Sequence, residues 1–101
     1  MEISFFFDTA MIHEFHNAIR QMVEREQKRS SISKKIVLYQ INEDEILDHG
    51  LVSQRLYKTR RFHDVVRVCC GRSFAHEELP QKLVYFPTLV ELIRLKKIHL
   101  D

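Results

Sequence analysis

The feature that most constrains the fold of this chain is a long apolar stripe near its N-terminus. Seven apolar residues recur at i, i+1, i+4, i+7, i+8, i+11 and i+12, which is the spacing of one face of an α-helix. Polar side chains, among them His13, His16 and Arg20, occupy the opposite side. The pattern predicts an amphipathic helix from Asp8, its expected N-cap, to about residue 29. The apolar residues of the stripe are Met11, Ile12, Phe15, Ala18, Ile19, Met22 and Val23.

The segments on either side of this helix have the composition of β-strands. Residues 2–7 form a short apolar run before it, and residues 36–41 form another after a serine-rich link at 30–33. Apolar side chains on both faces of each run predict strands that are covered on both sides. Two strands joined by a helix of this length are expected to pair in parallel through a right-handed crossover. We therefore expect an N-terminal βαβ unit.

Four further elements are expected between residues 43 and 86. Helical spacing over residues 43–57 predicts a second helix, in which Gly50 could mark a break. The β-branched run at 64–70 predicts a third strand, residues 73–79 a short helical turn, and residues 82–86 a fourth strand. The last segment is open between two alternatives. A helix opened by Pro87 is favoured over a pair of short strands.

The length of 101 residues predicts one domain, residues 1–101. With only two glycines and two prolines, the chain can form few tight turns, which argues against a many-stranded all-β fold. The expected architecture is a single α/β or α+β domain with an N-terminal βαβ unit. Its mixed sheet should have about four strands, with helices packed against it.

Charge and hydropathy narrow the setting in which the protein works. The net charge of +2 is too small to imply a nucleic-acid or membrane partner by itself. No apolar run approaches the roughly 18 residues of a membrane helix, and the N-terminus lacks the pattern of a signal peptide. We expect a soluble, cytoplasmic protein with no membrane partner. Cys69 and Cys70 are adjacent, so a structural disulfide is not expected.

A basic segment in the middle of the chain is the main candidate for a binding site. Arginine suits bidentate contact with phosphate or carboxylate, and aromatic rings between basic residues could stack on bases. The alternative is a solvated loop whose charges pair with the acidic segment at 43–48. The basic residues are Arg55, Lys58, Arg60, Arg61, Arg67 and Arg72, and the aromatic residues among them are Tyr57 and Phe62.

Other groups of reactive side chains have simpler explanations. His63, Cys69, Cys70 and His76 are zinc-ligand types, but adjacent cysteines on a strand point to opposite faces, and the chain has no CxxC. His13 and His16 fit exposed helix positions, and Asp8–Thr9 fits a helix cap. The chain has no GxGxxG, Walker A, HExxH or GxSxG motif. We therefore expect no catalytic residues, no metal and no cofactor.

One short segment resembles a known family. Phe86-Pro87-Thr88-Leu89 is similar to the segment that precedes the third strand of thioredoxin-like folds, where the proline is cis. The expected order β, α, β, α also matches, and residues 8–11 fall where that family carries its redox CxxC. Since those positions hold Asp8 to Met11, the resemblance implies a redox-inactive binding module. It also implies a cis Pro87 and a strand at 88–93.

These observations lead to three hypotheses about function. The first is a small, non-catalytic regulatory or adaptor protein that binds another protein, with the acidic 43–48 and basic 55–61 segments as complementary surfaces. The second is a nucleic-acid-binding protein that uses the basic segment at 55–72. The third is a metal- or thiol-dependent enzyme with a site that collects Asp8, histidines or Cys69. A homodimer formed through an edge strand at 82–86 is a further expectation about partners.

Overall fold

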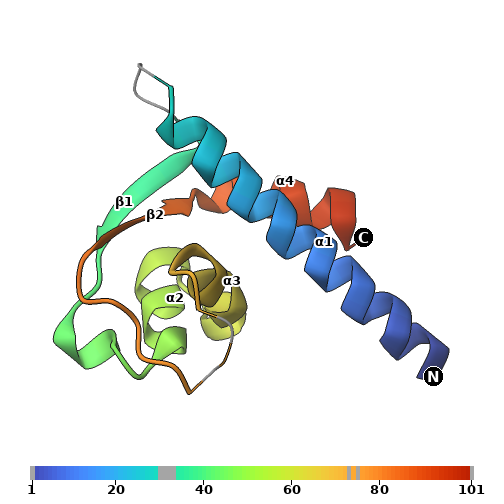
Figure 1. Cartoon of the computed structure of the whole chain (residues 1–101), viewed down its shortest axis with the longest axis horizontal. Coiled ribbons are helices and arrows are strands. Elements are labelled where there is room, and N and C mark those ends of the chain that lie inside the picture. Colours follow the sequence, from blue (N-terminus) through green and yellow to red (C-terminus); the bar gives the residue numbers. More distant parts are fainter. Residues whose placement is uncertain (1, 30–33, 73, 75, 101) are drawn as a thin grey trace.

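The computed structural model describes residues 2–29, 34–72, 74 and 76–100, and within them the chain forms an α+β domain (Figure 1). The described residues form four α-helices and one two-stranded antiparallel sheet. Two short 3-10 helices, η1 and η2, precede α2 and α3. In chain order the elements are α1 (Glu2–Gln27), β1 (Ile36–Gln40), η1 (Glu43–Glu45), α2 (His49–Tyr57), η2 (Arg60–Phe62), α3 (His63–Cys69), β2 (Leu83–Pro87) and α4 (Leu89–His99).

The predicted N-terminal βαβ unit is wrong, because the chain is helical from Glu2 onward. Residues 2–7 form the first turns of α1, and Asp8 and Thr9 lie inside this helix instead of capping it. A short apolar run is compatible with a strand or with a helix, so periodicity alone does not distinguish them. No glycine or proline occurs between residues 2 and 29 to interrupt the helix. The helix therefore continues through the segment that we expected to be a strand.

The strands predicted at 36–41 and 82–86 are confirmed as β1 and β2, but they are antiparallel. Val37 pairs with Phe86 and Tyr39 with Val84, and these side chains face the core. On the other face Leu38 and Tyr85 are paired and exposed. The outer face is therefore open at this pair, whereas Ile36 on the same face packs against core residues and its partner Pro87 is buried. In the described residues it has two strands, so the expectation of a mixed, four-stranded sheet was wrong.

The prediction of a strand at 64–70 is also wrong, since this segment forms α3. Val65 and Val66 are fully buried, and Cys69 packs beside them against both core clusters. Their spacing at i, i+1 and i+4 places all three on one side of a helix. β-Branched residues favour strands only weakly, so burial of this side decides the structure.

The helix predicted at 43–57 is interrupted, but the interruption precedes Gly50. Residues 46–48 separate η1 from α2, and Asp48 caps α2 by accepting a hydrogen bond from Leu51 N at 3.1 Å. Gly50 lies in the first turn of α2, where a Cβ would come within 3.0 Å of the Arg60 guanidinium.

A short helical turn was also expected at 73–79. Residues 73 and 75 lie outside the described residues, and the remainder of this segment is not helical.

The C-terminal alternative is resolved in favour of a helix. The expectation that Pro87 opens this helix was wrong, because Thr88 is the N-cap of α4 and Pro87 is the last residue of β2. Residues 88–93 are therefore not a strand, and no peptide bond in the described residues is cis. Two of the features that the thioredoxin-like resemblance implied are thus not found.

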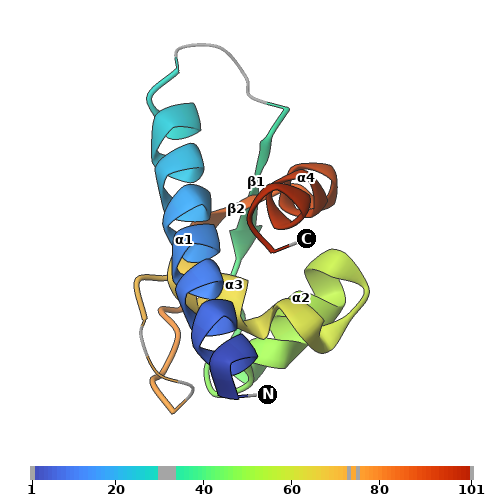
Figure 2. The ribbon, with the colours of Figure 1, turned by 90° about the vertical axis from the view of Figure 1, so that its right-hand side faces the viewer.

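Two clusters of buried side chains form the core. In the first, Phe15, Ile19 and Met22 of α1 pack with Leu92 and Leu95 of α4. The second lies beneath the inner face of the sheet, where it contacts α2 and α3. Helices α1 and α3 contact β2, so β1 is the outer strand of the sheet. Figure 2 shows α1 and α4 on opposite sides of the strands at the end where the chain enters β1.

Candidate functional site

The structure divides the predicted basic segment into separate groups. Arg55 binds Asp44 through Nη2 and Oδ2 at 2.7 Å, and it binds Glu45 through Nη1 and Oε2 at 3.2 Å. Arg60 binds Asp48 at 2.5 Å. Each pair joins the basic segment to the acidic segment at 43–48, which agrees with the alternative of local charge pairing. These two arginines are therefore neutralised within the molecule.

Glu45 is the centre of a polar cluster that sequence reasoning missed. Its side chain is fully buried, and its oxygens accept hydrogen bonds from Tyr39 Oη and, at 2.7 Å, from Asn42 N. Burial, followed by the nearby Glu45 carboxylate, raises the pKa of Tyr39 to about 12. A buried carboxylate is tolerated only when it is paired with a positive charge, and Arg55 supplies the positive charge for Glu45. The signal was present in the sequence as the capping-box spacing from Asn42 to Glu45.

The two aromatic residues predicted to stack on bases belong to the core instead. Tyr57 is 4% exposed, and its hydroxyl donates a hydrogen bond to Pro87 O at 2.8 Å. The ring of Phe62 packs edge-on against Tyr57, with centroids 5.6 Å apart. The burial of Tyr57 leaves it no accessible face on which a base could stack.

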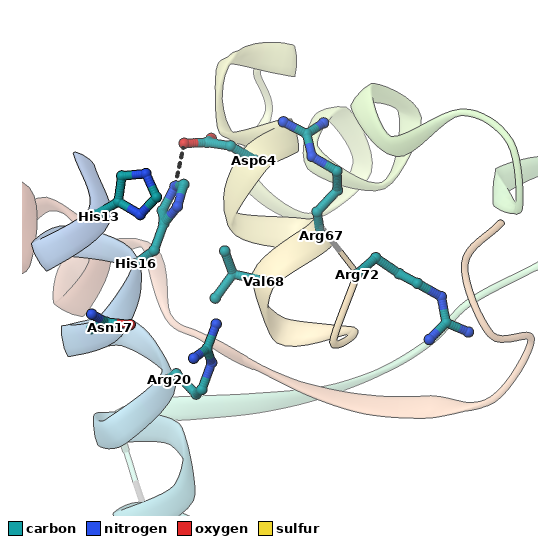
Figure 3. A pocket seen from close by; sticks show the side chains of 8 residues that line it. All are labelled: His13, His16, Asn17, Arg20, Asp64, Arg67, Val68 and Arg72. Carbon is teal, nitrogen blue, oxygen red and sulfur yellow. Dashed lines mark hydrogen bonds and ion pairs between the residues drawn. The ribbon is translucent and has the colours of Figure 1, made fainter. Parts of the chain in front are cut away.

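The other four basic residues lie in two places. Lys58 and Arg61 are exposed on the turn between α2 and α3, and neither forms an ion pair within the part of the chain that the structure describes. Arg67 and Arg72 line a hollow between α1 and α3, opposite Arg20 of α1 (Figure 3). The structure thus places α1 residues beside the predicted basic segment.

The hollow has a volume of about 210 Å³ and is lined by both helices. His16 Nε2 and Asp64 Oδ2 lie 2.8 Å apart and join α1 to α3 across it. Burial would raise the pKa of Asp64, but the hydrogen bond and charge interaction with His16 outweigh it and hold that pKa below its usual value. The lining residues are His13, His16, Asn17, Arg20, Asp64, Arg67, Val68 and Arg72.

The arginines around this hollow do not converge on one point. Figure 3 shows Arg20 beside Val68, while the side chains of Arg67 and Arg72 point away from it. Arg67 Nη1 donates to His63 Nδ1 at 3.0 Å, and Arg72 Nε donates to the Glu78 carbonyl at 2.8 Å. Tight anion binding needs donors directed at the same atoms. In this arrangement the hollow has a basic rim but no preformed site for a phosphate group.

The two cysteines lie at the end of α3 and are poor candidates for chemistry. Burial raises the pKa of both thiols, that of Cys70 to about 11. Thiols with such pKa values are protonated near pH 7, whereas a nucleophile needs the thiolate. Within the described ranges no three His, Cys, Asp or Glu side chains are grouped as metal ligands would be. The geometry thus offers nothing to the hypothesis of a thiol- or metal-dependent enzyme.

Helix α4 presents an apolar surface to solvent, which we call the α4 face: Leu89, Val90 and Ile93. These side chains are 40%, 79% and 42% exposed, whereas Leu92 and Leu95 on the opposite side are buried. The spacing i, i+1 and i+4 makes the three exposed residues neighbours on one side of the helix. The sequence contained this signal, since residues 89–93 include four apolar side chains, more than one face can bury.

Comparison of the chain with protein-family models, with curated proteins and with solved structures found no match. Among the described residues, no helix has both the length and the apolar character needed to cross a membrane. The surfaces of the domain itself are therefore the basis for an account of its function.

Proposed function

We propose that this protein is a small, non-catalytic regulatory or adaptor protein that binds another protein through the α4 face. The observation that carries the proposal is the exposure of Leu89, Val90 and Ile93 on one side of α4. Single exposed apolar residues are common on protein surfaces, but contiguous ones favour a partner.

The surroundings of the α4 face indicate the chemistry of that partner. The one carboxylate of α4, Glu91, is buried and accepts a hydrogen bond from Arg94 Nε at 2.9 Å. Beyond it the helix is basic, with Lys97 exposed and Lys96 and His99 in the last turn. A complementary surface would combine apolar side chains with carboxylates around them. The proposed partner is therefore a protein with an apolar patch flanked by acidic residues.

The proposal is tested with Val90→Asp, which places a charge at the centre of the α4 face. Leu47→Asp is a matched control, because Leu47 is 71% exposed and lies in the turn between η1 and α2. A partner captured by cross-linking in cells is purified, and its affinity for each variant is measured by calorimetry. Loss of one buried apolar side chain should raise the Kd at least about tenfold for Val90→Asp. The Leu47→Asp variant should bind as wild type does.

Two results would contradict this function. One is the absence of any purified protein that binds the wild-type chain. The other is an equal loss of affinity in both variants, which would mean that the α4 face is not the contact. Circular dichroism on each variant checks that the fold is unchanged.

A second candidate, nucleic-acid binding through the 55–72 segment, is favoured by Lys58 and Arg61, which are exposed and form no ion pair among the described residues. In its favour, phosphate contacts need only exposed charge and not a preformed pocket. Against it, Arg55 and Arg60 are neutralised by carboxylates. A gel-shift titration at low salt tests it, and binding must weaken steeply as salt is added. Wild-type affinity in a Lys58→Gln/Arg61→Gln variant would refute it.

A further inference from the structure

The outer strand of the sheet has an unprotected edge. β1 lies farther from the helices than β2, and its free edge faces outward in Figure 1. Its sequence, Ile-Val-Leu-Tyr-Gln, contains no charge, glycine or proline. Proteins usually protect an exposed edge with such residues, because free backbone groups attract another strand. β1 lacks that protection along all of its length.

Two backbone hydrogen bonds establish which residues of β1 face this edge. Ile41 N donates to Lys82 O at 3.0 Å, and Thr88 N donates to Lys35 O at 2.9 Å. In an antiparallel ladder, bonded and non-bonded pairs alternate along the strands. Odd-numbered residues of β1 therefore bond to β2. The even-numbered residues direct their N–H and C=O groups to the free edge, and these are Ile36, Leu38 and Gln40.

We propose that β1 pairs antiparallel with β1 of a second copy of this chain, forming a four-stranded sheet across a two-fold axis at Leu38. Symmetric dimers use the same surface on both copies, and a strand paired with itself about its central residue meets that condition. Leu38 would then bond to Leu38 of the second copy. Ile36 would bond to Gln40 of the second copy, so all three outward-facing residues would be satisfied.

The residues at the two ends of β1 select a second copy as the occupant of this edge. Lys34 is exposed just before the strand, and the acidic turn Glu43–Glu45 follows it. In the antiparallel arrangement Lys34 of each copy lies near Glu43 of the other. Opposite charges at the ends of a strand favour this pairing and disfavour a parallel one.

The side chains on the outer face of the sheet support the same arrangement. Leu38 is 45% exposed, and Tyr85 beside it is 38% exposed. Pairing at the two-fold axis would place the two Leu38 Cα atoms about 5.5 Å apart, so that the two side chains contact each other as a cross-strand pair. From the sequence we expected a dimer through the edge strand at 82–86, which is β2. We place the interface on β1 instead, because α1 and α3 contact β2.

Leu38→Pro is the decisive variant, with Leu38→Ala as its control. Proline removes the outward N–H of residue 38 but none of the bonds between β1 and β2, so the monomer should keep its fold. Sedimentation equilibrium of the wild-type chain should give a concentration-dependent dimer. Leu38→Pro should raise the dissociation constant of the dimer at least about tenfold more than Leu38→Ala does. The proline variant loses the two symmetric hydrogen bonds between the Leu38 residues of the two copies. A wild-type chain that stays monomeric at all concentrations overturns the proposal, as does equal dimerisation of both variants.

A charge reversal keeps the proposal testable if proline disturbs the strand. Lys34→Glu should weaken the dimer, and adding Glu43→Lys in the same chain should restore it. An unchanged dissociation constant for Lys34→Glu, or no recovery in the double variant, overturns the antiparallel register. The interface uses none of the α4 face, so Val90→Asp should leave dimerisation unchanged. Failure of the dimer is therefore distinguishable from failure of the proposed function.

Discussion

At the scale of single residues, the described part of this protein has one non-glycine residue with a positive φ. Lys58 ends α2 with φ 64° and ψ 19°, and its N–H donates to Gln54 O at 3.0 Å. This left-handed conformation is the usual way to end a helix, and glycine adopts it without steric cost. For lysine the Cβ is crowded, so the turn between α2 and α3 is strained at this position.

We predict that Lys58→Gly stabilises the protein by about 0.5–1 kcal/mol. Glycine relieves the strain of roughly 1–2 kcal/mol, and its larger entropy in the unfolded chain offsets part of the gain. Lys58→Ala is the matched control, because it removes the same charge and keeps the Cβ. Urea denaturation measures both variants. Equal stability of the glycine and alanine variants would show that strain at residue 58 is absent.

At the scale of elements, short polar contacts decide where helices begin. Asp48 starts α2 after the acidic turn, and Thr88 starts α4 directly after β2. The Thr88 hydroxyl accepts from Glu91 N at 3.4 Å, while Thr88 N itself bonds to Lys35 O. Thr88 thus turns the chain from strand to helix within one residue. Apolar residues 89–93 are compatible with either structure, and the cap favours the helix.

We predict that Thr88→Ala destabilises the protein by about 1 kcal/mol, the usual effect of losing an N-cap hydroxyl. Thr88→Ser keeps the hydroxyl and should lose much less. The backbone bond to Lys35 is unaffected by either change, so the comparison isolates the cap. Thermal or urea denaturation gives the difference. A serine variant as unstable as the alanine variant would mean that the Thr88 methyl group, and not the cap, matters.

At the scale of the whole molecule, contacts far apart in sequence hold the elements together. His16 and Asp64 are 48 residues apart and join α1 to α3 beside the core. The pKa of Asp64 is lowered in the folded protein, chiefly because the bond to His16 outweighs the effect of burial. Between the folded pKa and the usual value near 3.9, the unfolded chain binds more protons at this position. Stability should therefore rise with pH across that window.

We predict that Asp64→Asn loses stability at pH 7 and that this loss shrinks as the pH falls through the folded pKa of Asp64. The stabilisation is fully present above pH 3.9 or so and is lost as the carboxylate becomes protonated. Urea midpoints of wild type and variant are compared from neutral pH to about pH 3. Glu24→Gln, which removes an exposed carboxylate of α1, serves as the control. A pH-independent difference would contradict this role for Asp64.

Local sequence patterns predicted part of this fold. The apolar stripe from Met11 to Val23 predicted the central part of α1, and short apolar runs predicted β1 and β2. For residues 89–93 the sequence left helix and strand open and favoured the helix, which is found as α4. The candidate site was predicted less well, because Arg55 and Arg60 pair with carboxylates while Arg20, which lies opposite Arg67, comes from a distant helix. Charge pairing between segments depends on how they pack, which composition does not specify.

The sequence by itself determined the central part of α1, whose apolar periodicity extends over several turns, and the positions of β1 and β2. Only the tertiary structure decided that 2–7 and 64–70 are helical, that the two strands are antiparallel, and that Tyr57 is buried. Short apolar or β-branched runs have nearly equal local preference for helix and strand, a difference within about 1 kcal/mol. Burial against the rest of the molecule outweighs that difference. The same packing left the α4 face and the edge of β1 exposed, and the two proposals rest on these surfaces.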